Sequence, residues 1–73
     1  MLQVGSLLHR ARSGRLLIRL SREVRPGSYV LDEKGRRLGR VVEIIGGVRA
    51  PYASLAPSSS RDPKPGEPAF AEG

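Results

Sequence analysis

The sequence contains no cysteine and no tryptophan, and its aromatic residues are limited to two tyrosines and one phenylalanine. Without cysteine, the chain can form neither a disulfide framework nor a zinc site built on thiolates. Its 73 residues make one domain at most, residues 1–73. A chain of this size buries only about 60% of the surface that its unfolded form exposes. A closed, well-paired topology or a partner surface must therefore add stability that the core cannot supply.

Long apolar runs are also missing. No segment has the length of a signal-peptide core or of a membrane span. We therefore expect a cytoplasmic protein.

Residues suited to catalysis are few. His9 is the only histidine, and it ends a strand-like run, where a surface or packing role is the usual one. No nucleophile elbow or other triad signature is present. Asp32 and Glu33 lie in a predicted turn, where aspartate is expected for turn chemistry alone. The chain offers too few histidines and clustered carboxylates for a metal site. We expect no catalytic residue, no metal and no cofactor.

Positive charge is abundant. The net charge is +6, and eleven of the thirteen basic residues are arginines. The first 22 residues contain five arginines and no acid. This asymmetry favours proximity to nucleic acid, with Arg10, Arg12 and Arg15 as candidate contacts to RNA phosphates. A solvated basic face would give the same pattern. Base reading is disfavoured, because the aromatic residues on which bases would stack are scarce and scattered.

Helix signals are nearly absent, because no stretch sustains a 3.6-residue period and Gly, Pro or Ser interrupts the chain every six to ten residues. Short strands at this spacing predict a small barrel or sandwich. The predicted strands span residues 2–9, 15–20, 28–31, 36–45, 52–55 and 68–71. Six short strands favour a closed β-barrel, because closure removes edges that a tiny domain cannot otherwise protect.

The strand patterns also predict which side chains share a face. The first strand places Leu2, Val4 and Leu8 together, and the second places Leu16, Ile18 and Leu20 together. The fourth strand alternates imperfectly, since Arg40 and Glu43 fall on opposite faces. A bulge near Gly39 would shift the alternation of side chains between the two faces and bend this strand.

Turn signals separate the predicted strands. "RSG" at residues 12–14 and "DEKG" at residues 32–35 each provide a glycine for a left-handed position. "RPGS" at residues 25–28 is a Pro-Gly turn. A loop rich in proline and serine is expected at about residues 57–67.

A family resemblance appears in the hairpin and the segment after it. "PGSYVLDEKGRRLGRVVEIIGGVRAPYASLAP", residues 26–57, resembles the core of the glycine–arginine-rich (GAR) subunit of box H/ACA ribonucleoproteins. The matching positions are Val30, Asp32, Gly39, Val41, Glu43, Ile44, Gly46, Val48, Pro51 and Tyr52. "GSLLHRARSGRLLIRL" and "PGEPAF" resemble the first hairpin and last strand of archaeal members. Gly47 stands where the family usually has proline, and Ile45 where it usually has phenylalanine. The Gly/Arg-rich tails of the eukaryotic proteins are absent.

The resemblance implies a six-stranded barrel similar to the second domain of translation elongation factors. It implies a subunit without catalytic activity that docks on the dyskerin-like catalytic subunit of a guide-directed pseudouridine synthase. In that family the subunit aids loading and release of substrate RNA during ribosomal RNA pseudouridylation and contacts guide RNA only through the complex.

The composition of residues 44–56 agrees with docking, because Arg49 is their only charge. Docking patches are depleted in charge and carry a few large or rigid anchors. The candidate partner-binding residues are Ile44, Ile45, Gly46, Gly47, Val48, Pro51 and Tyr52. Pro51 fixes its own φ and holds the preceding residue extended. Two other interpretations stay open: Ile44 and Tyr52 fill the barrel core, and the glycines and Pro51 form an ordinary turn.

Two alternative functions remain. The hairpin "VLDEKGRRLGRVVEI" also resembles that of PRC-barrel domains, found in RNA-processing and photosynthetic proteins, although that family gives no strong reason for "GGVRAPY". A stand-alone RNA-binding barrel of Sm or OB type is favoured by the charge and disfavoured by the aromatic count.

Overall fold

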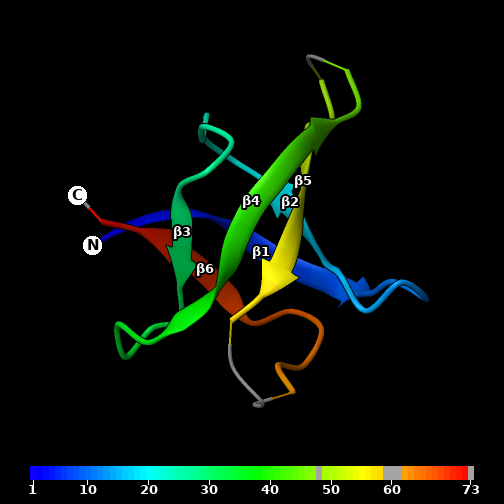
Figure 1. Ribbon diagram of the computed structural model, residues 1–73. Helices are drawn as coiled ribbons and strands as arrows, with labels where there is room; N and C mark the ends of the chain where they lie inside the picture. The colour runs from blue at the N-terminus through cyan, green and yellow to red at the C-terminus, as the bar shows by residue number, and fades with distance from the viewer. Residues whose placement is uncertain (48, 59–61, 73) are drawn as a thin grey trace.

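Six strands close into a β-barrel in the computed structural model, which describes residues 1–47, 49–58 and 62–72. The strands are β1 (Leu2–Arg10), β2 (Leu16–Leu20), β3 (Tyr29–Leu31), β4 (Arg37–Ile45), β5 (Tyr52–Pro57) and β6 (Pro68–Ala71). Their order around the ring is β1-β2-β5-β4-β3-β6, and each neighbouring pair is antiparallel (Figure 1). The predicted six-stranded closed barrel is confirmed.

The strand boundaries differ most from prediction in β5. This strand continues past the predicted end at Leu55 to Pro57, because Pro57 pairs with Gly39 of β4. The Ser58 amide then donates to the Leu38 carbonyl at 3.1 Å, which prolongs the contact with β4. Pro57 therefore belongs to the sheet. Residues 59–61 of the predicted loop lie outside the described residues.

The face predicted for β1 is wrong in two of its three residues. Val4 is buried together with Leu7, whereas Leu2 is 44% exposed and Leu8 is 36% exposed. The register of β1 shifts between Gln3 and Gly5 against β6, and between Leu7 and His9 against β2. Each shift inserts one unpaired residue, so strict alternation along the strand is lost.

β4 carries the predicted bulge and a second one. The register against β3 shifts between Arg37 and Gly39, as expected near Gly39. Against β5 it shifts again between Val41 and Glu43. The second shift places Arg40 and Glu43 opposite Ala56 and Ser54, which lie on one face of β5. Arg40 and Glu43 therefore share the outer face, contrary to the prediction.

Apolar side chains from all six strands fill the barrel. The buried core consists of Val4, Leu7, Leu16, Ile18, Leu20, Val30, Leu38, Val41, Ala53, Leu55 and Ala69. The predicted face of β2 is confirmed by its three members of this set. Alanines in β5 and β6 take little interior volume, which suits a barrel of six short strands.

The turns at one end of the barrel follow the sequence signals. Gly14 and Gly35 have φ values of 90° and 83°, so both predicted left-handed positions are confirmed. We call this end, which holds turns 11–15 and 32–36 and the described residues 62–67, the hairpin end. The opposite end holds loop 21–28 and the described residues 46, 47 and 49–51, and we call it the mouth end (Figure 1).

Asp32 organises the turn between β3 and β4 at the hairpin end. Its Oδ1 accepts hydrogen bonds from the amides of Lys34 and Arg36, each at 2.9 Å, and its Oδ2 accepts one from Arg36 Nε at 3.2 Å. Burial of the carboxyl raises its pKa. The two amides and the Arg36 guanidinium outweigh this effect, so the pKa of Asp32 lies below its ordinary value. Asp32 is therefore a structural carboxylate of the turn.

Candidate protein-docking surface

Ile44 belongs to a row of paired residues whose side chains point into the barrel. It lies at the end of this row, beyond the closed part of the barrel. It pairs with Ala53, and Ala53 pairs with Ile18, so the row crosses β4, β5 and β2. Ala53 and Ile18 are fully buried, whereas Ile44 is 41% exposed. The side chain thus points toward the barrel axis at the mouth end, where no described strand covers it. Ile44 is not a core residue.

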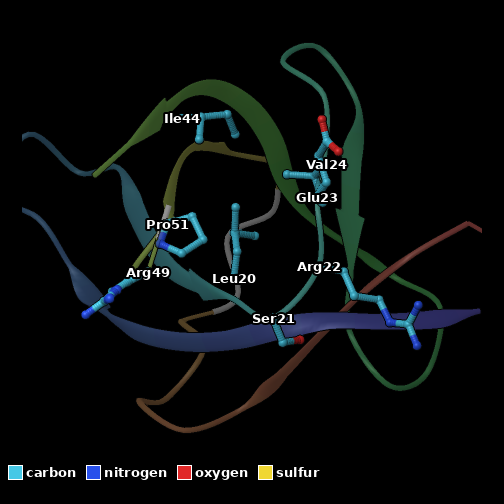
Figure 2. A pocket seen from close by; sticks show the side chains of 8 residues that line it. All are labelled: Leu20, Ser21, Arg22, Glu23, Val24, Ile44, Arg49 and Pro51. Carbon is cyan, nitrogen blue, oxygen red and sulfur yellow. The ribbon is translucent and has the colours of Figure 1, made fainter. Parts of the chain in front are cut away.

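A hollow of about 630 Å³ opens at this position. It is lined by Leu20, Ser21, Arg22, Glu23, Val24, Ile44, Arg49 and Pro51. In Figure 2, Ile44, Leu20, Pro51 and Val24 surround the opening, while the side chains of Arg22 and Arg49 extend away from it on opposite sides. We call this the mouth hollow. Its centre is apolar, and its charged groups lie at the rim.

The loop after β4 forms the wall of the mouth hollow next to Ile44. Gly46 has a φ of 92°, a left-handed value that side chains rarely adopt. A Cβ there would clash with the Ala50 carbonyl oxygen and lie 3.1 Å from the Tyr52 ring. The Ala50 amide donates to the Gly47 carbonyl at 3.2 Å. Gly46 is thus required by the loop geometry, whereas a Cβ at Gly47 would meet nothing within 4 Å.

Pro51 joins this loop to the opposite wall. Its carbonyl accepts a hydrogen bond from the Leu20 amide at 3.0 Å, and its ring lines the mouth hollow. The turn interpretation is therefore correct for Gly46, Gly47 and Pro51, and Pro51 also lines the mouth hollow. Val48 lies outside the described residues.

Ile45 and Tyr52 lie on the outer wall instead. They pair with each other, and Tyr52 pairs in turn with Arg19 of β2. Ile45 is 43% exposed, and Tyr52 is half-buried and outside the core cluster. The core interpretation of Tyr52 is therefore wrong. The predicted partner-binding residues form two adjoining surfaces, one inside the mouth and one around its outer edge.

The second wall of the mouth hollow was not found from the sequence. Leu20, Ser21 and Val24 come from the end of β2 and the following loop, at least twenty residues before residues 44–56. Leu20 fits the core pattern of its strand, so its position at the opening has no sequence signal. Only the pairing of β2 with β5 brings it beside Pro51.

The three candidate phosphate contacts lie near the hairpin end. Arg10 forms an ion pair with Asp62 at 3.2 Å, and Arg15 lies 3.9 Å from Glu43. Arg12 is exposed and makes no ion pair within the described part of the chain. Two of these three arginines are therefore partly neutralised within the protein, and all three lie away from the mouth hollow.

The described residues hold no group of three or more histidine, cysteine, aspartate or glutamate side chains that could bind a metal ion. Within the same residues, no helix has the length and apolar character needed to cross a bilayer.

Comparison with known proteins finds relatives in archaea. The chain is 34% identical to an uncharacterized protein of Methanothermobacter thermautotrophicus over 61 residues, which cover 84% of this chain and 66% of the relative. It is 39% identical to an uncharacterized protein of Methanocaldococcus jannaschii over 51 residues, covering 70% of this chain and 62% of that relative. The chain thus matches slightly less than two thirds of each relative's length. No protein-family model matches it.

Proposed function

We propose that this protein is the GAR-type subunit of an archaeal box H/ACA ribonucleoprotein. In this role it has no catalytic activity of its own and docks on the dyskerin-like pseudouridine synthase subunit. It aids loading and release of substrate RNA while guide RNA selects uridines of ribosomal RNA. This places it in ribosome biogenesis, in the cytoplasm of an archaeon. The proposal rests on the resemblance described above and on the surface that the same segment forms.

The observation that carries the proposal is the mouth hollow beside exposed Ile45. Ile44 and Ile45 are 41% and 43% exposed at one end of the barrel, next to the rigid Pro51. Leaving large apolar side chains in water is unfavourable, and a contiguous group of them marks an interaction site. A partner that inserts an apolar side chain between Ile44, Pro51 and Leu20 would cover this surface.

The rim indicates the chemistry of the partner segment. Arg22 and Arg49 flank the mouth hollow and form no ion pair within the described residues, whereas Glu23 is the only acid that lines it. Acidic groups on the partner, placed on either side of its apolar anchor, would complement these arginines. We therefore expect a partner segment with an apolar anchor and flanking carboxylates.

Capture by the purified dyskerin-like subunit of the same organism tests the proposal. We expect Tyr52→Ala and Pro51→Ala each to weaken binding by about 2 kcal/mol or more, the size expected for an interface anchor. Arg12→Ala, at the hairpin end, is the matched control and should bind as the wild type does. Normal binding by both folded anchor variants would contradict docking through this surface.

RNA binding by the isolated protein provides a second test. We expect weak, sequence-indifferent affinity that is lost between low and physiological salt, because it depends on contacts to phosphates. Tight, sequence-selective binding by the protein alone would instead support the stand-alone RNA-binding barrel.

A further inference from the structure

Tyr29 forms a stack with an arginine on the outer face of β3. Its side chain is 39% exposed. The guanidinium carbon of Arg37 lies 4.0 Å from the centroid of its ring, and Arg40 is its partner across the β3–β4 ladder. A guanidinium over an aromatic ring is attracted by the π electrons, and the contact holds two flat groups together. The surface thus presents an aromatic ring with a guanidinium over it, which we call the platform.

The arginines of this platform form no ion pair within the described part of the chain. The ion pairs within the described residues involve Arg10, Arg15 and Arg36, and neither Arg37 nor Arg40 takes part in one. Asp32, the buried acid of the same hairpin, is bound by Arg36. Arg40 Nε donates to the Gly27 carbonyl at 3.2 Å, which fixes its guanidinium beside β3 without neutralising it. The platform therefore attracts anions.

Phe70 lies on the same side of the barrel. Leu31 pairs with Arg37 on β4 and with Phe70 on β6, so these three residues point to the same side of the sheet, where Leu31 itself is covered and only 5% exposed. Tyr29 precedes Leu31 by two positions and shares that face. Phe70 is half-buried. Two of the three aromatic residues of the chain thus gather on one surface, although they are distant in the sequence.

We propose that the outer face of β3, β4 and β6 binds single-stranded RNA. Tyr29 and Arg37 form the stacking platform for a base, and Arg40 contacts a phosphate. Single-strand binders combine aromatic or guanidinium planes for the bases with positive charge for the backbone, and such stacking tolerates any base. A flat stack of ring and guanidinium suits a flat, anionic ligand better than it suits a flexible acidic peptide.

This surface is separate from the docking surface. β3 and β6 neighbour neither β2 nor β5 in the ring, and Arg37 and Arg40 lie in the half of β4 remote from Ile44. Tyr29, Arg37, Arg40 and Phe70 do not line the mouth hollow, so RNA bound to them would leave the hollow itself open. The RNA proposal does not depend on the identity of the docking partner.

Tyrosine fluorescence provides a direct test, because the chain contains no tryptophan. In the Tyr52→Phe variant, Tyr29 is the only tyrosine. Titration with an oligouridine of about 12 nucleotides at low salt should quench its emission saturably, since a base stacked on the Tyr29–Arg37 pair lies close to the ring. Binding that leaves the emission unchanged would overturn the proposed platform.

Affinities for the same labelled oligouridine test the individual residues. We expect Tyr29→Ala to weaken binding about tenfold with no change in salt dependence, because it removes stacking but no charge. Tyr29→Phe, which keeps the ring, should bind like the wild type. Cooperative thermal unfolding of each variant checks that it is folded.

The two arginines test the place of the positive charge. Arg37→Gln should weaken binding more than Arg12→Gln, which removes the same charge from the hairpin end. Equal losses in the two arginine variants, or no loss in Tyr29→Ala, would overturn the proposal. Capture of the dyskerin-like subunit should be unaffected by Tyr29→Ala.

Discussion

The mouth end and the hairpin end of the barrel are built from the same strands but leave different groups exposed. At the hairpin end, Asp32 binds two amides and Arg36, and Arg10 pairs with Asp62. At the mouth end, Ile44 and Ile45 are exposed, and Arg22, Glu23 and Arg49 form no ion pair within the described residues. Asp32 and Arg10 at the hairpin end are thus paired within the chain, whereas the mouth end leaves an apolar surface in water.

We therefore expect substitutions at the two ends to affect different properties, folding at the hairpin end and binding at the mouth end. Groups that are already satisfied within the chain have little to gain from a partner, so changes at the hairpin end should act on folding. Exposed apolar groups gain free energy when a partner covers them, so changes at the mouth end should act on binding. The predictions below test this division.

The largest effect is expected for Ile44→Asp. A charge placed among Leu20, Val24 and Pro51 would be buried without a partner in the complex, so binding of the dyskerin-like subunit should fall by about 2 kcal/mol or more. Titration calorimetry measures this loss. Folding stability should change little, because Ile44 is already 41% exposed.

Val42→Asp is the matched control for this substitution. Val42 belongs to the same strand and is 40% exposed, but it lies at the bulge of β4 and does not line the mouth hollow. It should leave binding unchanged. Equal losses in the two variants would show that the whole exposed face of β4, and not the mouth, contacts the partner.

The next effect concerns stability. Asp32→Ala removes the acceptor of the Lys34 and Arg36 amides, which we expect to cost about 2 kcal/mol in the free energy of unfolding. Urea denaturation measures it. Asp62→Ala removes a carboxylate that is 85% exposed and should cost about 0.5 kcal/mol or less. Equal losses of unfolding free energy in the two variants would mean that the hydrogen bonds of Asp32 stabilise the protein no more than the exposed Arg10–Asp62 ion pair does.

Lowering the pH should reduce the difference in the free energy of unfolding between Asp32→Ala and the wild type. The pKa of Asp32 is lowered in the folded state, so its charge contributes stability above its ordinary, unfolded pKa. That contribution is lost as the pH falls through the lowered folded pKa. A difference that stayed constant down to that acidic range would contradict a role for the ionised carboxylate.

The smallest effect distinguishes two adjacent glycines. Gly46→Ala should lower stability by about 1 kcal/mol, because the left-handed φ and the Ala50 carbonyl disfavour a side chain. Gly47→Ala meets no atom within 4 Å and should change stability by about 0.5 kcal/mol at most. Thermal unfolding measures both. Equal effects would mean that the loop does not require its left-handed residue.

Local signals in the sequence were sufficient for the fold class. The alternation in β2, the left-handed glycines at residues 14 and 35 and the short β6 were all predicted, because period-two patterns and turn chemistry depend on residues close in the sequence. The faces of β1 and β4 were not predicted correctly. Their bulges are set by the neighbouring strands, and a single inserted residue reverses the expected face.

The candidate site was predicted only in part. The nearly uncharged segment at residues 44–56 identified Ile44, Ile45, Pro51 and Tyr52, but composition could not tell a core residue from an exposed one. Nothing in the sequence connected Leu20 or Val24 with this segment, or Tyr29 with Phe70. Those neighbourhoods arise from strand pairing, which joins residues far apart in the chain.

By itself, the sequence determined that this chain forms short strands joined by tight turns, with no cysteine chemistry and an excess of arginine. Closure of the barrel decided which residues those strands bury. Ile44 lies on an inward row yet stays exposed, because that row continues beyond the closed part of the sheet. Whether an apolar residue serves the core or a partner therefore depended on where the barrel ends, which no local pattern contains.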